Sequence, residues 1–384
     1  MRKVVVLGAT GSIGCQTLEV AARFPDKIRV VGLSAGSNIS LVAEQTRQFG
    51  VRNVVLKDEK TAEEFRRFGF LDVEVLLGID GLCRLASLSE ADTVVNGLVG
   101  SLGLRPSLAA LEAGKRLCLA NKEALVMGGQ LVLAAKKRGK GELVPIDSEH
   151  SALFQCLLAG GSRGVRRVFL TASGGPFLNW PKDEMLSAKP SDALKHPTWT
   201  MGKKITIDSA TLFNKALEVI EAHFLFGLTP EQIEVVVHPQ SIVHSLVEFA
   251  DGSTMAQLGP PDMRIPIQYA LSYPERWESP YGTFGPMSFG NLNFLPLDNE
   301  KFPSVKMAYR ALQMGGTAPA VLAAADECAV GLYLEEKISF GEIFELVGEA
   351  LEAHQPIESP TVEDIEGTER WARAFITDRV KVSV

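Results

Sequence analysis

The sequence has no long apolar run, no basic block and no paired cysteines, and each absence excludes a class of protein. No apolar run approaches the roughly 18 residues of a membrane-spanning helix, and no block of basic residues offsets the net charge of −7. We therefore expect neither a membrane nor a nucleic acid as a partner. The five cysteines are scattered, odd in number and without a Cys-x-x-Cys pair, which predicts reduced thiols in a cytoplasmic protein.

Apolar residues are abundant enough to build a large core. The 384 residues are 46% hydrophobic and 22% charged, which is typical of a soluble chain with two or three domains. Met1-Arg2-Lys3 precedes only a short apolar stretch, which glycines soon interrupt, so we expect no cleaved leader.

The N-terminal third has the pattern of a nucleotide-binding domain. An apolar strand at residues 3–7 runs into Gly8-Ala9-Thr10-Gly11-Ser12-Ile13-Gly14, which opens a helix through about residue 24. Gly8 permits a tight turn, Gly11 lets the backbone approach a pyrophosphate, and Gly14 lets helix and strand pack closely. The pattern predicts a dinucleotide site; a plain strand-to-helix turn is the alternative.

The continuation of this domain predicts a parallel, doubly wound sheet that binds NADP. The second strand, residues 28–33, ends in Ser34-Ala35-Gly36-Ser37-Asn38 without the acid that would grip the ribose hydroxyl of NAD. Strands and helices then alternate, as such a sheet requires. The expected strands are residues 54–56, 93–96 and 116–119, and the expected helices are residues 41–49, 61–70 and 104–113.

Three polar residues follow one of these strands. Ligands bind at the carboxyl ends of parallel strands, so Asn121, Lys122 and Glu123 are expected to face the nicotinamide end of the cofactor. The alternative is that Asn121 only caps the next helix and that Lys122 is a solvated charge.

Half of a metal site is predicted where the next apolar strand, residues 143–146, ends. Asp147 and Glu149 are spaced i, i+2, so on an extended backbone their side chains point to the same side. A helix expected at residues 151–159 turns its N-terminal N–H groups toward them and favours ionised carboxylates. An ordinary solvated strand end is the alternative.

A third carboxylate lies in a strongly helical run at residues 210–226. Asn214, Lys215 and Glu218 share one helical face, which brings an amide, an ammonium and a carboxylate together. Ser209 is expected at the helix start, where a phosphate contact is natural. The alternative is an exposed acid paired with Lys215.

A phosphate-binding turn and a lid are expected between these acids. The strand at residues 167–171 ends in Ala172-Ser173-Gly174-Gly175-Pro176, a turn with exposed amides and a hydroxyl. Residues 179–204 form a long segment without expected secondary structure that contains His196 and Trp199, which favours a lid closing over a ligand. Packing of Trp199 on its own loop is the alternative.

The rest of the chain predicts structural elements. Strands at residues 235–237, 242–249 and 254–258 suggest an antiparallel hairpin platform, and His238 and His244 suit its core as well as catalysis. A surface linker is expected at residues 273–303. Helical spacing at residues 305–354 and 362–375 then predicts a small helical domain that braces the middle one.

Together these segments resemble the 1-deoxy-D-xylulose 5-phosphate reductoisomerase family, NADPH-dependent enzymes of non-mevalonate isoprenoid synthesis. The resemblance covers essentially the whole chain. Its specific part is the acid pair together with residues 209–218. It rests on residues 8–14, 120–123, 145–152, 171–177, 196–202, 207–222 and 238–245.

The resemblance implies a role for each candidate residue. Asp147, Glu149 and Glu218 would be ligands of one divalent cation, and Lys122 would lie near the reacting carbons. The substrate would contact Lys122, Ser148, Glu149, Ser173, His196, Trp199, Ser209, Asn214, Lys215 and Glu218, with Trp199 as the lid residue. NADPH would contact Thr10, Gly11, Ser12, Ile13, Gly36, Ser37, Asn38, Asn121, Glu123 and Gly202. The chain departs from the family in having Ser37 where some members have a basic residue and Asp326 where asparagine is common.

The resemblance also implies an α/β architecture and a homodimer. A Rossmann-like NADPH-binding domain would occupy residues 1–147, and an α+β catalytic, connective and dimerisation domain residues 148–272. The second domain would carry a lid at about residues 180–205. A linker at residues 273–298 would lead to a helical domain at residues 299–384.

The implied activity is the rearrangement and reduction of 1-deoxy-D-xylulose 5-phosphate to 2-C-methyl-D-erythritol 4-phosphate. Three carboxylates and an oxygen-rich substrate suit Mg²⁺ or Mn²⁺, with Co²⁺ as a further candidate, rather than zinc. Two alternatives stay open. One is another NADP-dependent dehydrogenase of a small phosphorylated substrate, for which Cys156 is the only cysteine near the acid pair; the other is a non-catalytic NADP-binding protein.

Overall fold

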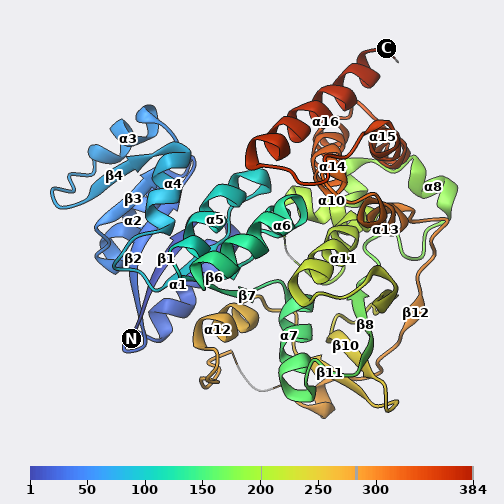
Figure 1. The fold of residues 1–384 in the computed structure, drawn as a ribbon, viewed down its shortest axis with the longest axis horizontal. Helices are drawn as coiled ribbons and strands as arrows, with labels where there is room; N and C mark the ends of the chain where they lie inside the picture. Colours follow the sequence, from blue (N-terminus) through green and yellow to red (C-terminus); the bar gives the residue numbers. More distant parts are fainter. Residues whose placement is uncertain (200, 282–283, 383–384) are drawn as a thin grey trace. The chain divides into compact units, whose positions relative to one another are not determined.

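The computed structural model describes residues 1–199, 201–281 and 284–382, and the chain divides into two compact units (Figure 1). The first unit comprises Met1–Ala124, Gln130–Ser151 and Asp262–Thr283. The second comprises Leu125–Gly129, Ala152–Pro261 and Phe284–Val384. Thr200, within the expected lid, lies outside the described residues. The division into three domains and a linker stays a prediction.

The first unit contains a seven-stranded parallel sheet in the order β4-β3-β2-β1-β5-β6-β7. Its strands read as nearly continuous runs of Val and Leu because helices cover both faces. The strand order reverses between β1 and β5, the usual ligand position in such sheets, which confirms the doubly wound expectation. The strands are β1 (Arg2–Leu7), β2 (Ile28–Ala35), β3 (Asn53–Leu56), β4 (Glu74–Leu77), β5 (Thr93–Asn96), β6 (Arg116–Leu119) and β7 (Glu142–Pro145).

Helices connect these strands, and two neighbouring elements were not expected from the sequence. The edge strand β4 runs directly into α4 through Gly78, whose φ is +59°, so no run of turn residues separates them. The helices of this unit are α1 (Ser12–Arg23), α2 (Ile39–Phe49), α3 (Glu59–Arg66), α4 (Gly78–Ala86), α5 (Leu104–Glu112) and α12 (Arg264–Ser272). Helix α6 (Lys122–Gly139) and helix α7 (Ser148–Gly160) each begin in the first unit and contribute residues to the second.

The second unit contains a five-stranded sheet in the order β11-β10-β8-β9-β12. The hairpin of β10 (Val243–Phe249) and β11 (Thr254–Leu258) is antiparallel, as expected. The strand β9 (Ile233–Val237) is not part of that hairpin platform, because it pairs parallel with the far edge of β8 (Val165–Ala172). The short β12 (Leu295–Pro296) closes this edge.

The segment expected to lack secondary structure contains two short helices, α8 (Lys182–Leu186) and α9 (Pro190–Ala193). Both start at a proline or directly after one, which fixes the backbone dihedral that a first helical turn needs. The following run is two helices, α10 (Lys203–Thr211) and α11 (Phe213–Phe226), because Leu212 between them has a left-handed φ of 59°. The expectation of a helix start near Ser209 is therefore wrong.

The chain ends in helices, as expected, and the described residues divide them into α13 (Ser304–Met314), α14 (Ala318–Leu334), α15 (Phe340–Ala353) and α16 (Val362–Val382). They lie together as the orange-to-red group in Figure 1. Alanine, valine and leucine fill the buried face of α14, where small side chains let neighbouring helices approach closely. In the part of the chain that the structure describes, no helix combines the length and apolarity needed to cross a membrane.

Candidate functional site

The glycine turn after β1 has the close packing that its sequence predicted. Gly8 has a left-handed φ of +79°, and its N–H donates to Ser34 Oγ at 2.9 Å. A Cβ on Gly14 would lie 2.2 Å from the Gly8 oxygen, so helix α1 could not pack here with any side chain. Thr10 is half-buried, and Gly11 is exposed at the helix N-terminus. The pyrophosphate contact of Gly11 stays a prediction.

The end of β2 offers three exposed residues, Gly36, Ser37 and Asn38. The Asn38 side chain caps α2 by accepting a hydrogen bond from Leu41 N–H at 3.2 Å. The uncharged Asn38 side chain therefore holds this loop, and residues 36–38 contain no carboxylate that could accept a hydrogen bond from a ribose hydroxyl.

Asn121 caps α6, as the alternative proposed. Its Oδ1 accepts from Ala124 N–H at 3.1 Å, while its Nδ2 donates to the carbonyls of Leu98 and Gly100 and to Glu123 Oε2. The other half of that alternative is wrong, because Lys122 is only 6% exposed. Asn121 therefore fixes the turn that carries Lys122 at the carboxyl end of β6.

Lys122 and Asp147 form an ion pair within the first unit, with Nζ 2.5 Å from Oδ2. Their side chains are 8% and 14% exposed, so the pair lies in a partly desolvated position where its attraction is stronger than in water. An ordinary solvated strand end is therefore excluded for Asp147.

The expected extended geometry of the acid pair is wrong. Asp147 Oδ1 accepts from Ser148 N–H at 2.9 Å and its carbonyl from Ser151 N–H at 2.8 Å, so the residue caps a helix that begins at once. Glu149 is consequently helical, and residues spaced i, i+2 on a helix do not face each other. Its Oε2 accepts from Ser148 Oγ at 2.5 Å, in the first turn of α7, where the dipole favours the ionised form.

Glu218 is completely buried in the second unit. Its two carboxylate oxygens accept hydrogen bonds from Asn214 Nδ2 at 2.7 Å and Lys215 Nζ at 2.6 Å. The shared helical face and the pairing with Lys215 are confirmed, whereas the exposed-acid alternative is wrong. A buried carboxylate without such partners would cost several kcal/mol of folding free energy, so the amide of Asn214 and the ammonium of Lys215 offset the burial of this acid.

Three side chains of the second unit form a hydrogen-bonded trio: Ser173, His196 and Ser209. His196 Nε2 lies 3.1 Å from Ser173 Oγ and 3.0 Å from Ser209 Oγ. Ser173 comes from the turn after β8, His196 from the segment before α10, and Ser209 from the last turn of α10. The sequence expectation that these residues act at one place is consistent with this cluster.

The backbone determines which nitrogen of His196 carries the proton. Thr198 and Trp199 donate their N–H groups to Nδ1 at 3.2 and 2.9 Å, so Nδ1 is unprotonated and the neutral ring carries its proton on Nε2. Burial lowers the pKa of His196 below its ordinary value, which also favours the neutral ring. Nε2–H can therefore donate to a serine hydroxyl or to an anionic ligand.

Trp199 is half-buried, and its ring centroid lies 6.4 Å from that of His244. Gly202, the N-cap of α10, is exposed. His238 is a core residue, because its Nδ1 bonds to the Asn293 carbonyl at 2.8 Å and its Nε2 accepts from two backbone N–H groups. Both ring nitrogens of His238 are therefore engaged by the backbone, which favours the core role over the catalytic one.

The cysteines do not supply an activated thiol. Cys156 is 4% exposed, and burial raises its pKa to about 11. Burial likewise raises the pKa of Cys118 to about 12. The thiolate is the nucleophilic form of cysteine, so these protonated thiols do not suit a covalent dehydrogenase mechanism.

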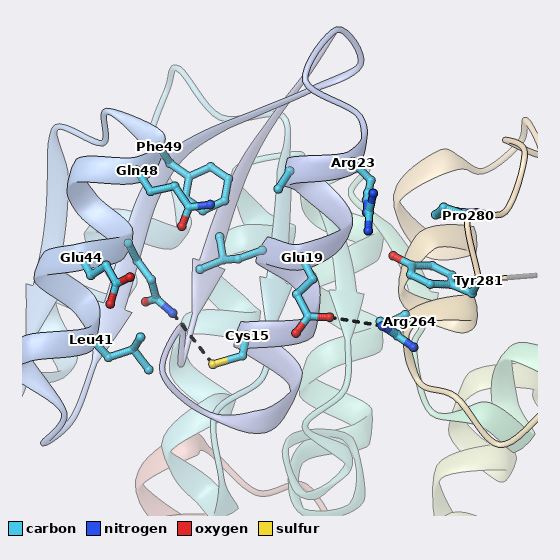
Figure 2. Close-up of a pocket in the computed structure, with 13 residues that line it drawn as sticks. Cys15, Glu19, Arg23, Leu41, Glu44, Gln48, Phe49, Arg264, Pro280 and Tyr281 are labelled. Carbon is cyan, nitrogen blue, oxygen red and sulfur yellow. Dashed lines mark hydrogen bonds and ion pairs between the residues drawn. The ribbon is translucent and has the colours of Figure 1, made fainter.

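A groove of about 660 Å³ in the first unit is lined by α1, α2 and residues near α12 (Figure 2). Arg264 lies 3.5 Å from Glu19, which also lines the groove, and 2.6 Å from Asp262 outside the lining. Burial raises the pKa of Cys15, which also lines the groove. None of the candidate site residues lines this groove, so it does not enter the candidate site.

Sequence reasoning missed Lys301, which the structure gives a defined role. Its Nζ donates to the carbonyls of Phe177, Leu178 and Trp180 at 2.6, 3.0 and 2.6 Å. Lys301 is more than 120 positions away from these residues, so no local spacing could have revealed the contact.

Three family models match the chain in sequence order. Residues 4–129 match the model described as 1-deoxy-D-xylulose 5-phosphate reductoisomerase, residues 143–226 its C-terminal domain, and residues 258–375 a further model described as DXP reductoisomerase C-terminal domain. Relatives of the same name in Synechococcus sp. and Gloeobacter violaceus are each 49% identical. The alignments cover 97% and 98% of this chain, and 96% and 97% of those proteins.

Solved structures agree with these matches. A DOX-P reductoisomerase in complex with NADPH, fosmidomycin and magnesium is 39% identical, with a TM-score of 0.94 over 100% of this chain and 99% of that one. The 1-deoxy-D-xylulose 5-phosphate reductoisomerase from Zymomonas mobilis in complex with NADPH is 38% identical, with a TM-score of 0.93 over 99% of both chains.

Proposed function

The chain belongs to the 1-deoxy-D-xylulose 5-phosphate reductoisomerase family, and on this basis we propose which of its residues perform the reaction. The protein is an NADPH-dependent oxidoreductase that uses a divalent cation to convert 1-deoxy-D-xylulose 5-phosphate in isoprenoid synthesis. The absence of an acid after β2 predicted NADP, and that cofactor is confirmed. The two alternative functions are thereby excluded.

Asp147, Glu149 and Glu218 are the proposed ligands of the divalent cation. The donor set fits, because three carboxylates offer only hard oxygen atoms, which suit Mg²⁺ and also Mn²⁺. The buried, charge-paired carboxylate of Glu218 is the single observation that carries this assignment, since burying it for stability alone would be costly. A bound cation would act as a Lewis acid on the carbonyl and hydroxyl oxygens of the substrate.

Ser173, His196 and Ser209 are proposed to hold the substrate phosphate. The trio offers two hydroxyls and an imidazole N–H, all of which can donate to phosphate oxygens. Because the ring is neutral, it can bind the dianion by donation without first taking up a proton. Asn214 and Lys215 fix the orientation of Glu218 and are proposed, with Ser148, to contact substrate hydroxyls.

Lys122 is proposed to act at the reacting carbons, where its ammonium can stabilise negative charge that develops on a substrate oxygen. In the rearrangement one carbon–carbon bond of the substrate breaks and another forms, which leaves an aldehyde. The cofactor supplies a hydride to the aldehyde carbon, and a proton completes the alcohol of 2-C-methyl-D-erythritol 4-phosphate. Trp199 is proposed to cover the carbon chain and exclude water during these steps.

The proposed NADPH contacts lie at the carboxyl ends of strands in the doubly wound sheet and in the lid. The N-terminus of α1 favours the pyrophosphate by its dipole and its free N–H groups. The proposed residues are Thr10, Gly11, Ser12, Ile13, Gly36, Ser37, Asn38, Asn121, Glu123 and Gly202.

The proposal extends to a cytoplasmic homodimer. β11 is an edge strand with Thr254, Met255 and Ala256 exposed, and such an edge can pair with a second copy. All five cysteines are free thiols, which suits a reducing compartment. Light scattering on the purified protein tests the assembly, and a mass of one chain would contradict it.

One assay tests the proposed chemistry. NADPH oxidation is followed with 1-deoxy-D-xylulose 5-phosphate as the only substrate, first with Mg²⁺, then with a chelator, then with Mg²⁺ or Mn²⁺ restored. We expect turnover that the chelator abolishes and either metal recovers. Turnover that survives complete chelation would contradict the metal-ligand assignment.

A further inference from the structure

The C-terminal helices and the turn before α13 supply none of the proposed ligands, yet they hold the segment that carries His196 and Trp199 at both of its ends. On the N-terminal side, Lys301 binds three carbonyls between residues 177 and 180, and Tyr333 OH donates to the Ala188 carbonyl at 3.0 Å. Ala193, at the end of α9, is fully buried. The chain is therefore fixed up to this point.

On the C-terminal side, the anchor is an ion cluster. Lys204 Nζ lies 2.6 Å from Asp208 Oδ2 and 2.9 Å from Asp326 Oδ2. Asp208 is one helical turn along α10, whereas Asp326 is on α14, 122 residues away. The Asp326 side chain is completely buried and that of Asp208 is 4% exposed, so their hydrogen bonds to Lys204 offset a large desolvation cost.

The position of Lys204 is itself unfavourable for a cation. It is the second residue of α10, where the positive end of the helix dipole repels an ammonium. The two carboxylates more than compensate, so the N-terminus of α10 is held on α14 by this cluster and not by an ordinary cap: Gly202, the N-cap, has no side chain.

The two anchors define a lid, which we take as the described residues 194–199 and 201–203. Within it, His196 and Trp199 are half-buried, and Lys195 and Lys203 are exposed. The lid is attached to α10, and α10 carries Ser209, which bonds to His196 Nε2. A shift at Lys204 would therefore change both the lid and the phosphate-binding trio at once.

We propose that Lys204, held by the buried Asp326 acceptor, is a positioning residue that sets the closed position of the lid over the substrate phosphate. The inference rests on the proposed function, because it assigns a purpose to the lid and the trio. It gives the C-terminal helices a part in substrate binding beyond bracing. Because Asp326 acts through Lys204, an oxygen acceptor at position 326 is the essential property.

Three variants on α14 test this proposal. Asp326→Leu removes the acceptor, Asp326→Asn keeps a carbonyl oxygen for Lys204, and Glu327→Leu is the matched control. Glu327 is the next residue of the same helix, and it forms an ion pair at 2.8 Å with Arg373 of α16. Each enzyme is assayed for kcat and for the KM of the sugar phosphate and of NADPH.

We expect Asp326→Leu to raise the KM of the sugar phosphate about tenfold, or ~1.4 kcal/mol, and the KM of NADPH by a smaller factor, because Gly202 is its one proposed contact in the lid. Asp326→Asn should restore most of the substrate affinity, and Glu327→Leu should leave both KM values unchanged. Equal effects of Asp326→Leu and Glu327→Leu would overturn the proposal. A failure of the wild type to turn over the sugar phosphate would instead overturn the proposed function.

Limited trypsin digestion measures whether ligands protect the lid from cleavage, and this protection would not change if Asp326 only stabilised the fold. Saturating substrate and NADPH should protect the bonds after Lys195 and Lys203 in the wild type and in Asp326→Asn, but not in Asp326→Leu. Where Asp326→Leu does not fold, Lys204→Arg and Lys204→Met decide: the arginine variant should keep the protection and the methionine variant should lose it. Full protection in Lys204→Met would contradict the proposal.

Discussion

Lys122 Nζ lies 2.5 Å from Asp147 Oδ2, and the two side chains belong to consecutive strand ends of one parallel sheet. The second unit repeats this relationship with Lys215 and Glu218 at 2.6 Å. In each unit, therefore, a lysine forms a largely buried ion pair with a proposed metal-ligand carboxylate and fixes its orientation. Each acid therefore presents its carboxylate oxygens in a fixed position.

Glu218→Gln should reduce kcat/KM at least about a hundredfold, because the amide removes one anionic ligand from a hard-cation site. The residual activity should need more Mg²⁺ to saturate. The assay is NADPH oxidation with a Mg²⁺ titration. Cys156→Ser serves as the control and should retain most activity, since its thiol is buried and protonated. The reverse pattern would favour a thiol-based mechanism.

Lys122→Met should make Mg²⁺ a stronger stabiliser of the fold. In the wild type a cation must compete with the ammonium for Asp147, whereas in the variant it meets a carboxylate that has lost this partner. Without metal the free energy of unfolding of the variant should be about 3 kcal/mol lower than that of the wild type. Urea unfolding with a chelator and with Mg²⁺ measures both effects. If Mg²⁺ stabilises the two proteins equally, Asp147 is not a ligand.

The sequence predicted the elements of this fold better than the junctions between them. The glycine turn and the strands β5 and β6 are local patterns, fixed by alternating apolar runs and by residues with special backbone freedom. The helix start at Ser148 was misjudged because Asp147 caps it directly, without intervening turn residues. Leu212 breaks α10 from α11 although leucine rarely adopts a left-handed φ, so composition gave no sign of the break.

The candidate site was predictable where its residues share one element. Asn214, Lys215 and Glu218 lie within one helical turn, so their spacing alone determined that they meet. The bonds of Lys301 to residues 177–180 and of Lys204 to Asp326 join positions more than a hundred residues apart. Only the tertiary fold brings such groups together, and a single sequence contains no pattern that encodes them.

Trp199→Ala should raise the KM of the sugar phosphate at least about tenfold and that of NADPH only slightly, because the indole is proposed to cover the substrate's carbon chain. Trp180→Ala is a suitable control: Trp180 is 37% exposed and packs on Phe177 with ring centroids 4.9 Å apart, at the fixed end of the same segment. It should change stability more than either KM. Equal losses for both ligands in Trp199→Ala would contradict the lid role.

The free energy of unfolding should depend on pH through His196. Burial lowers the pKa of His196 in the folded protein, so between the unfolded value near 6.5 and that lower value the unfolded chain binds more protons. Stability therefore falls as the pH is lowered through this window. The backbone N–H groups of Thr198 and Trp199 strengthen the effect, because both already donate to Nδ1, where the second proton would have to go.

His196→Asn cannot titrate and should lose less stability than the wild type between pH 7 and about pH 5. His238 and His354, whose pKa values burial also lowers, are present in both proteins, so the difference in slope isolates His196. Urea unfolding at a series of pH values measures it, and parallel curves for the two proteins would mean that His196 takes up its proton as easily when folded as when unfolded.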